Sequence, residues 1–164
     1  FPDPPAHTPR RDDLGAPRTI DPSRTRRDLV RAHYAPVHPV DPTIRGVSHV
    51  LWADKPKVVE GDSEPADGRN AVFYGERAID RSPCGTGTSA RLAHLHATGR
   101  LKKGERFIHQ SYITSRFIGC VEDEVDLGGQ PAIIPSIQGS AISTGFNTIW
   151  IDREDRFWQG FQVL

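Results

Sequence analysis

A cysteine on a glycine-rich turn between a strand and a helix constrains this chain most. The apolar run Asn70–Tyr74 predicts a strand, and the alanine-rich run 88–98 predicts a helix. Cys84 lies between them, at or just before the helix N-terminus. Free N–H groups and the positive end of the helix dipole attract an anion there and favour a thiolate over a thiol. The turn therefore predicts a reactive thiol beside a site for a small carboxylate.

Two other interpretations of Cys84 stay open on the residues alone. Free cysteines are commonly buried and inert, so Cys84 is also compatible with a packed thiol near a turn that contains glycines. A cysteine hydrolase would need a histidine base close to Cys84, and the sequence places none.

The order Asp-Arg-Ser-Pro-Cys-Gly-Thr-Gly-Thr, from Asp80 to Thr88, resembles the second half-site of the proline racemase family, which includes hydroxyproline 2-epimerases. The resemblance extends over most of residues 37–164 and includes Asn70–Tyr74 and Glu105–Gly119. It implies an α+β fold of the diaminopimelate epimerase-like architecture, in which a curved antiparallel sheet is wrapped around a central helix.

The same resemblance divides the chain into two parts. Residues 37–164 would form the C-terminal racemase-like domain that carries Cys84. Residues 1–36 would be an irregular or partial segment, a remnant of the first domain or a linker. The chain begins at Phe1 and contains no methionine, so we expect a fragment of a longer enzyme or a mis-started chain.

The resemblance implies a cofactor-independent racemase or epimerase that inverts the α-carbon of proline or hydroxyproline. Two thiols would face opposite sides of that carbon, one as thiolate base and the other as thiol acid. Carried over residue by residue, Cys84 is one thiol, Asp80 contacts the substrate nitrogen, and Gly85 and Thr86 donate backbone N–H groups to the carboxylate. Tyr74 stands where proline racemases have a phenylalanine against the ring, and its hydroxyl leaves room for a hydroxyproline.

The chain departs from the family pattern by lacking the Cys-Gly-His motif of the first half-site. The other cysteine, Cys120, falls within a strand signal, and we interpret it as structural. We therefore expect that the chain alone does not racemise efficiently and that an N-terminal half-site is missing. The alternative is an orphan half-domain that binds a small carboxylate or complements a separate N-terminal half. A homodimer is compatible with either interpretation.

Charge and composition exclude several classes of protein. The chain has 21 Lys and Arg against 21 Asp and Glu, so no broad basic field predicts nucleic-acid binding. No apolar run reaches the roughly 18 residues of a membrane span, and no secretory signal is visible. Two cysteines suggest no disulfide framework, which favours the cytoplasm. His49, His94 and His96 lack metal-ligand spacing, so no metal is expected.

The regions on either side of the cysteine turn also predict secondary structure. Residues 1–25 are rich in proline, arginine and aspartate and predict irregular structure, followed by a helix over about 23–33 with Leu29 and Val30 facing inward. Beyond Gly104 an antiparallel meander is expected, interrupted at 119–120, with turns at 123–124 and 128–129. The predicted strands cover 47–52, 107–113, 116–121, 132–135, 138–144 and 147–151. A bend or bulge is expected at 144–147. Trp158 and Phe161 are expected to anchor the C-terminal end in the core.

Overall fold

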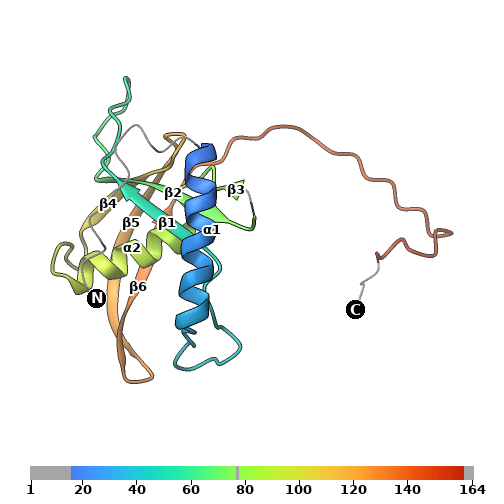
Figure 1. Ribbon diagram of the computed structural model, residues 1–164. Helices are drawn as coiled ribbons and strands as arrows, with labels where there is room; N and C mark the ends of the chain where they lie inside the picture. The colour runs from blue at the N-terminus through green and yellow to red at the C-terminus, as the bar shows by residue number, and fades with distance from the viewer. Residues whose placement is uncertain (1–15, 77, 161–164) are drawn as a thin grey trace.

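The computed structural model describes residues 16–76 and 78–160, which form an α+β body and an extended C-terminal segment (Figure 1). One sheet contains all the strands, in the order β1-β2-β4-β5-β6, and β3 pairs with β2 beside this path. In chain order the elements are α1 (Ala16–His33), β1 (Val50–Asp54), β2 (Gly68–Tyr74), β3 (Ala78–Ile79), α2 (Gly85–Ala97), β4 (Arg106–Gln110), β5 (Arg116–Leu127) and β6 (Gln130–Gln138).

The sheet is mixed, which corrects the expectation of a purely antiparallel one. β2 and β4 are parallel, with Gly68 paired to His109, whereas the other neighbouring pairs are antiparallel. Parallel neighbours need a crossover connection, and α2 provides it between β2 and β4. This crossover brings the start of α2 close to β2.

The two helices cover opposite faces of the sheet. Successive residues of a strand point to opposite faces of the sheet. In β1 the Leu51 side chain approaches α2. The next residue, Trp52, donates its indole N–H to Ser23 Oγ of α1 at 2.7 Å. The main core lies under α2. It consists of Leu92, Leu95, Leu101, Phe107 and Val121, with Ile133 and Ile137 packed against it.

Helix α1 differs from its prediction in both extent and orientation. It begins at Ala16, so residues 16–25 are helical rather than irregular, and residues 1–15 lie outside the described range. Leu29 and Val30 are 55% and 40% exposed, and among residues 21–33 the buried positions are Ser23 and Arg27. The Arg27 guanidinium donates to the Gly75 carbonyl and lies 5.4 Å from the Phe73 ring centroid, so a polar contact with the end of β2 orients the helix.

The β5–β6 hairpin is longer than predicted. β5 runs without interruption through Gly119 and Cys120 and through the expected turn at 123–124, where the pairing shows only a register shift between Val121 and Asp123. The turn at 128–129 is confirmed. β1 begins at Val50, later than the predicted start at residue 47.

Gly119 is required for the packing of α2 on β5. A Cβ atom at Gly119 would lie 2.8 Å from Leu92 Cδ1, and the Leu92 side chain is fully buried. Replacing Gly119 by alanine should therefore lower the free energy of unfolding by about 1–3 kcal/mol, the usual cost of an extra methyl group in a packed core. Urea unfolding measures this, with Gly145→Ala as the control because a Cβ there meets nothing within 4 Å. Equal midpoints for the two variants would contradict this packing.

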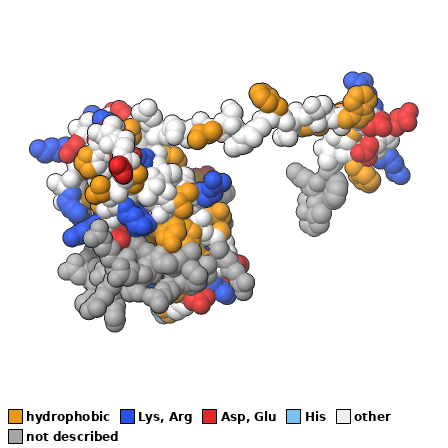
Figure 2. Space-filling model, turned by 90° about the horizontal axis from the view of Figure 1, so that it is seen from above, with side chains coloured by type: hydrophobic (Ala, Val, Ile, Leu, Met, Phe, Trp, Pro, Cys, Tyr) orange, Lys and Arg blue, Asp and Glu red, His pale blue; other side chains and the backbone are white. Residues whose placement is uncertain are grey.

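The C-terminal segment, residues 139–160, contains no strand, so the predicted strands beyond Gln138 and the bulge at 144–147 are wrong. Its large apolar side chains face solvent (Figure 2): Phe146 and Trp150 are 104% and 88% exposed. Trp158 is 47% exposed and is not a core anchor, and Phe161 lies outside the described residues. A strand needs a neighbour for its N–H and C=O groups, and this segment lies apart from the sheet (Figure 1).

Candidate functional site

Cys84 is the N-cap residue of α2, which confirms its predicted place at a helix N-terminus. The helix begins at Gly85, earlier than the predicted residue 88. Cys84 Sγ accepts a hydrogen bond from Gly87 N–H at 3.4 Å and lies 3.3 Å from Thr86 Oγ1. Gly85 and Thr86 are exposed, and the N–H groups of a first turn have no carbonyl partner within the helix. The sulfur and these N–H groups therefore share the positive end of the helix dipole.

The backbone of Cys84 has an unusual conformation. Its φ of 64° and ψ of 120° lie in a region that non-glycine residues rarely adopt, at a cost of about 1–3 kcal/mol. Neighbouring hydrogen bonds hold it: Cys84 N–H donates to Ser82 Oγ at 3.0 Å, and Thr88 N–H donates to the Cys84 carbonyl at 2.8 Å. Gly87 keeps this turn uncrowded, since a Cβ there would lie 3.1 Å from Leu51 Cδ1 and 3.3 Å from Cys84 Cβ.

Asp80 is joined to Cys84 through Ser82. Asp80 Oδ1 accepts from both Ser82 N–H and Ser82 Oγ–H, each at 2.9 Å, and the same hydroxyl oxygen accepts from Cys84 N–H. Asp80 is half-buried. The carboxylate therefore shapes the turn that carries the thiol and lies within the same short loop.

Tyr74 lies at the end of β2, 41% exposed, with its ring stacked on His49 at 6.0 Å between centroids. The register pairs Val50 with Phe73, and continued by one residue it sets His49 beside Tyr74, on the same face as Leu51. Leu51 Cδ1 is 3.1 Å from the position that a Cβ on Gly87 would take, so this face looks toward the cysteine turn. From the sequence, His49 was expected to be a partly buried or surface histidine and not a metal ligand, and no contact with Tyr74 was predicted. The alternation of β1 would have placed it with Leu51.

A buried polar cluster lies behind the cysteine turn and was missed by sequence reasoning. Asn70 Nδ2 and Thr88 Oγ1 both donate to the Pro83 carbonyl, at 2.6 and 3.2 Å, and His109 Nδ1 lies 3.0 Å from Thr88 Oγ1. Burial, and then the nearby charge of Arg91, lower the pKa of His109 to about 4, so its ring is neutral near pH 7. The three side chains come from β2, α2 and β4, and no local pattern connects them.

Cys120 lies apart from this site, half-buried in β5. Burial and the nearby Glu122 carboxylate raise the pKa of its thiol, which makes a thiolate there less favourable. Within residues 16–76 and 78–160, no three His, Cys, Asp or Glu side chains are grouped so that they could hold a metal ion. Neither helix in that part of the chain is long and apolar enough to cross a bilayer.

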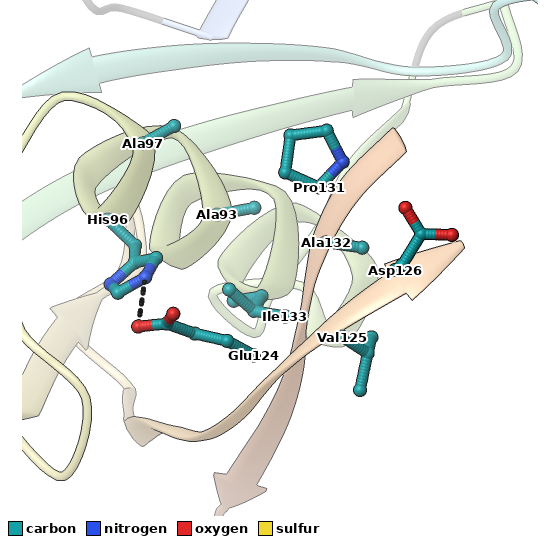
Figure 3. Close-up of a pocket in the computed structure, with 9 residues that line it drawn as sticks. All are labelled: Ala93, His96, Ala97, Glu124, Val125, Asp126, Pro131, Ala132 and Ile133. Atoms are coloured by element: carbon teal, nitrogen blue, oxygen red, sulfur yellow. Dashed lines mark ion pairs between the residues drawn. The ribbon is translucent and has the colours of Figure 1, made fainter. Parts of the chain in front are cut away.

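The other end of α2 borders a groove against the β5–β6 hairpin (Figure 3). Its volume is about 640 Å³, and the small side chains of Ala93, Ala97 and Ala132 contribute to its walls. His96 Nε2 lies 3.0 Å from Glu124 Oε1 at its side. At 1.5 Å of rise per residue the groove is separated from Cys84 by roughly 13–20 Å along the helix, so it is not part of the thiol site.

Comparisons with known proteins agree on one family. The family model described as proline racemase matches residues 15–162. The chain is 49% identical over 162 residues to a 4-hydroxyproline 2-epimerase of Spirosoma linguale, covering 99% of this chain and 47% of the relative. It is 53% identical over 152 residues to a 4-hydroxyproline 2-epimerase of Ancylobacter novellus, covering 93% of this chain and 44% of the relative.

The similarity extends to solved structures. A hydroxyproline epimerase from Agrobacterium vitis with bound trans-4-hydroxy-L-proline superposes with a TM-score of 0.70 and 33% identity, covering 89% of this chain and 40% of that one. A probable proline racemase from Agrobacterium radiobacter with bound carbonate gives the same TM-score at 34% identity, covering 88% of this chain and 41% of that one. The chain spans about half the length of the curated relatives it matches.

Proposed function

Because this chain belongs to the proline racemase family, we propose that it forms one side of the active site of an isomerase that inverts the α-carbon of proline or hydroxyproline. The observation that carries the proposal is the N-cap position of Cys84, whose sulfur accepts a hydrogen bond from Gly87 N–H at 3.4 Å. A thiolate is favoured at such a position. The relatives named as 4-hydroxyproline epimerases make hydroxyproline the preferred substrate in this proposal.

The proton transfer can be written with this chain's residues on one face of the substrate. The Cys84 thiolate removes the α-proton, and the C–H electron pair moves into the carboxylate to give an enediolate-like anion. The N–H groups of Gly85 and Thr86 bind that carboxylate and stabilise the charge as it develops. A second thiol then donates a proton to the opposite face, which inverts the carbon. In the reverse direction Cys84 is the acid.

The second thiol is proposed to come from outside the described residues. Cys120 is half-buried in β5 and lies outside the cysteine turn. The chain alone should therefore exchange the α-proton on one face without efficient racemisation. We place residues 37–164 in a racemase-like domain of the diaminopimelate epimerase-like architecture, with α1 packed on its sheet. A reducing compartment such as the cytoplasm would keep the thiol free.

At the rim of the site, Tyr74 and His49 are proposed to contact the substrate ring. Their rings stack on the face of the sheet that looks toward the cysteine turn. Tyr74 presents a hydroxyl and His49 a ring nitrogen, and either group can form a hydrogen bond with a hydroxyl on the pyrrolidine ring. This supports a hydroxyproline over proline as the substrate.

Replacing Asp80 by asparagine should separate its two roles. Asparagine keeps an Oδ1 acceptor for Ser82 N–H and Oγ–H, so the turn and the thermal unfolding temperature should be retained. The lost charge should weaken the contact with the substrate ammonium, which lowers kcat/KM by about 10- to 100-fold, as for a hydrogen bond to a charged group. Steady-state epimerisation assays measure this. An unchanged kcat/KM would show that Asp80 only shapes the turn.

Protection of Cys84 from alkylation tests the proposal as a whole. Iodoacetamide labelling, read by peptide mass spectrometry, should be slowed at Cys84 by pyrrole-2-carboxylate, a planar carboxylate, whereas labelling of Cys120 should not change. Exchange of the hydroxyproline α-proton in D2O, followed by NMR, then tests the chemistry. Protection without exchange would favour a carboxylate-binding half-domain, and absence of protection would contradict the carboxylate site.

A further inference from the structure

We propose that His109 is a positioning residue for Cys84 and acts through Thr88 and the Pro83 carbonyl. This inference rests on the proposed role of Cys84 as the reacting thiol. It starts from the backbone of Cys84, whose φ of 64° is costly for a residue with a side chain. Such a conformation persists only when the surrounding structure holds it. The orientation of the peptide group between Pro83 and Cys84 sets the direction of the Cys84 side chain. Groups that hold this peptide in place therefore also position the sulfur.

Two buried donors hold the Pro83 carbonyl. Asn70 Nδ2 donates at 2.6 Å from β2, and Thr88 Oγ1 donates at 3.2 Å from the first turn of α2. Asn70 and Thr88 are 2% and 0% exposed, so water does not compete for the carbonyl. The orientation of the peptide before Cys84 is therefore set by side chains from two different elements.

The proton count assigns the role of His109. Thr88 has a single hydroxyl proton, and directing it to Pro83 leaves only lone pairs to face His109 Nδ1 at 3.0 Å. In the tautomer that this proposal requires, His109 carries its proton on Nδ1 and donates it to Thr88 Oγ1. Asn70 Nδ2 lies 3.4 Å from His109 Nδ1, and in this tautomer it donates to the Pro83 carbonyl alone. His109 thereby fixes the direction in which Thr88 donates.

His109 acts at a distance from the substrate rather than on it. The residue is 1% exposed, and its ring packs against Phe107 at 5.2 Å between centroids. The parallel pairing of β4 with β2 sets His109 beside Gly68, where an added Cβ would lie 3.8 Å from His109 Cδ2. The strand pairing therefore fixes the ring before any ligand arrives.

Paired substitutions test this role in the intact enzyme. His109→Leu removes the Nδ1 donor, whereas His109→Asn places an amide N–H near the same point. We expect kcat for α-proton exchange to fall about 10-fold in His109→Leu with KM within about 2-fold, because a lost buried hydrogen bond typically costs that much. His109→Asn should recover most of kcat. Thr88→Val and Thr88→Ser form a second pair, in which we expect kcat to fall in Thr88→Val and to be largely recovered in Thr88→Ser. This pair provides the test if His109→Leu does not fold.

A matched core variant and a local readout make the test decisive. Val121→Ala destabilises the core under α2 without removing a contact of Asn70, Thr88 or His109. This variant should leave kcat within about 2-fold. An equal loss in Val121→Ala, or no loss in both His109→Leu and Thr88→Val, would overturn the inference. The Cys84 13Cβ chemical shift reports its backbone conformation without activity. It should move in His109→Leu and not in His109→Asn, so this result stands even if the proposed reaction is wrong.

Discussion

Replacing Cys84 by serine should reduce α-proton exchange on hydroxyproline by about 1,000-fold. The serine hydroxyl stays protonated near neutral pH and cannot act as the base, and a positioned acid or base contributes about 100- to 10,000-fold. The fold should not suffer, because serine is a favoured N-cap residue and can accept the Gly87 N–H in place of the sulfur. NMR in D2O measures the exchange, and thermal unfolding measures the stability.

Cys120→Ser is the matched control for this substitution. Cys120 is half-buried in β5 and its thiol pKa is raised, first by burial and then by Glu122. Exchange should stay within about 2-fold of the unmodified enzyme in this variant, since a thiol outside the cysteine turn takes no part in the proton transfer. Wild-type exchange in Cys84→Ser would show that another group removes the proton and would remove the basis of the proposed mechanism.

The second large effect is expected in the pH dependence of stability. Burial, and then Arg91, lower the pKa of His109 from its ordinary value of 6.5 to about 4 in the folded chain. Above pH 6.5 the ring is neutral in both states, so it adds no pH dependence. Between pH 6.5 and 4, His109 is protonated in the unfolded chain but still neutral in the folded chain. The free energy of unfolding therefore falls as the pH is lowered. The loss should reach about 3 kcal/mol near pH 4, at 1.36 kcal/mol per pKa unit.

A comparison with His109→Asn isolates this contribution from the other titrating groups. Asparagine does not titrate, so the stability of the variant relative to the unmodified protein should improve by about 2–3 kcal/mol between pH 7.5 and 4.5. Urea unfolding of both proteins at pH 7.5 and at pH 4.5 gives the difference in their free energies of unfolding at each pH. A constant difference across this range would show that His109 is not held neutral by its surroundings.

The cysteine turn could be predicted because its features are contiguous. A strand, a glycine-rich turn and an alanine-rich helix follow one another within residues 70–97, and each leaves a local pattern. Helix α2 and the position of Cys84 at its start were confirmed on this basis. The helix start was placed too late because Gly85 and Gly87 have low intrinsic helix propensity, whereas the cap at Cys84 begins the helix before them.

Several of the predictions that failed depended on distant partners. The apolar segment 147–151 has strand propensity, but a strand forms only beside another strand, and this segment has none next to it in the described structure. Leu29 and Val30 were expected inside because they are apolar, yet Arg27 orients α1 through the Gly75 carbonyl and turns those two side chains outward.

The sequence alone determined the local chemistry of this protein: a thiol at a helix start, an acidic residue in the same loop, and an order of residues that indicates the family. Tertiary structure alone decided what holds that thiol. Asn70, Thr88 and His109 meet behind the Pro83 carbonyl because α2 makes a crossover and sets β4 parallel to β2. Short-range propensity acts over neighbouring residues, whereas strand pairing joins residues far apart in the chain, so only the folded sheet brings these groups together.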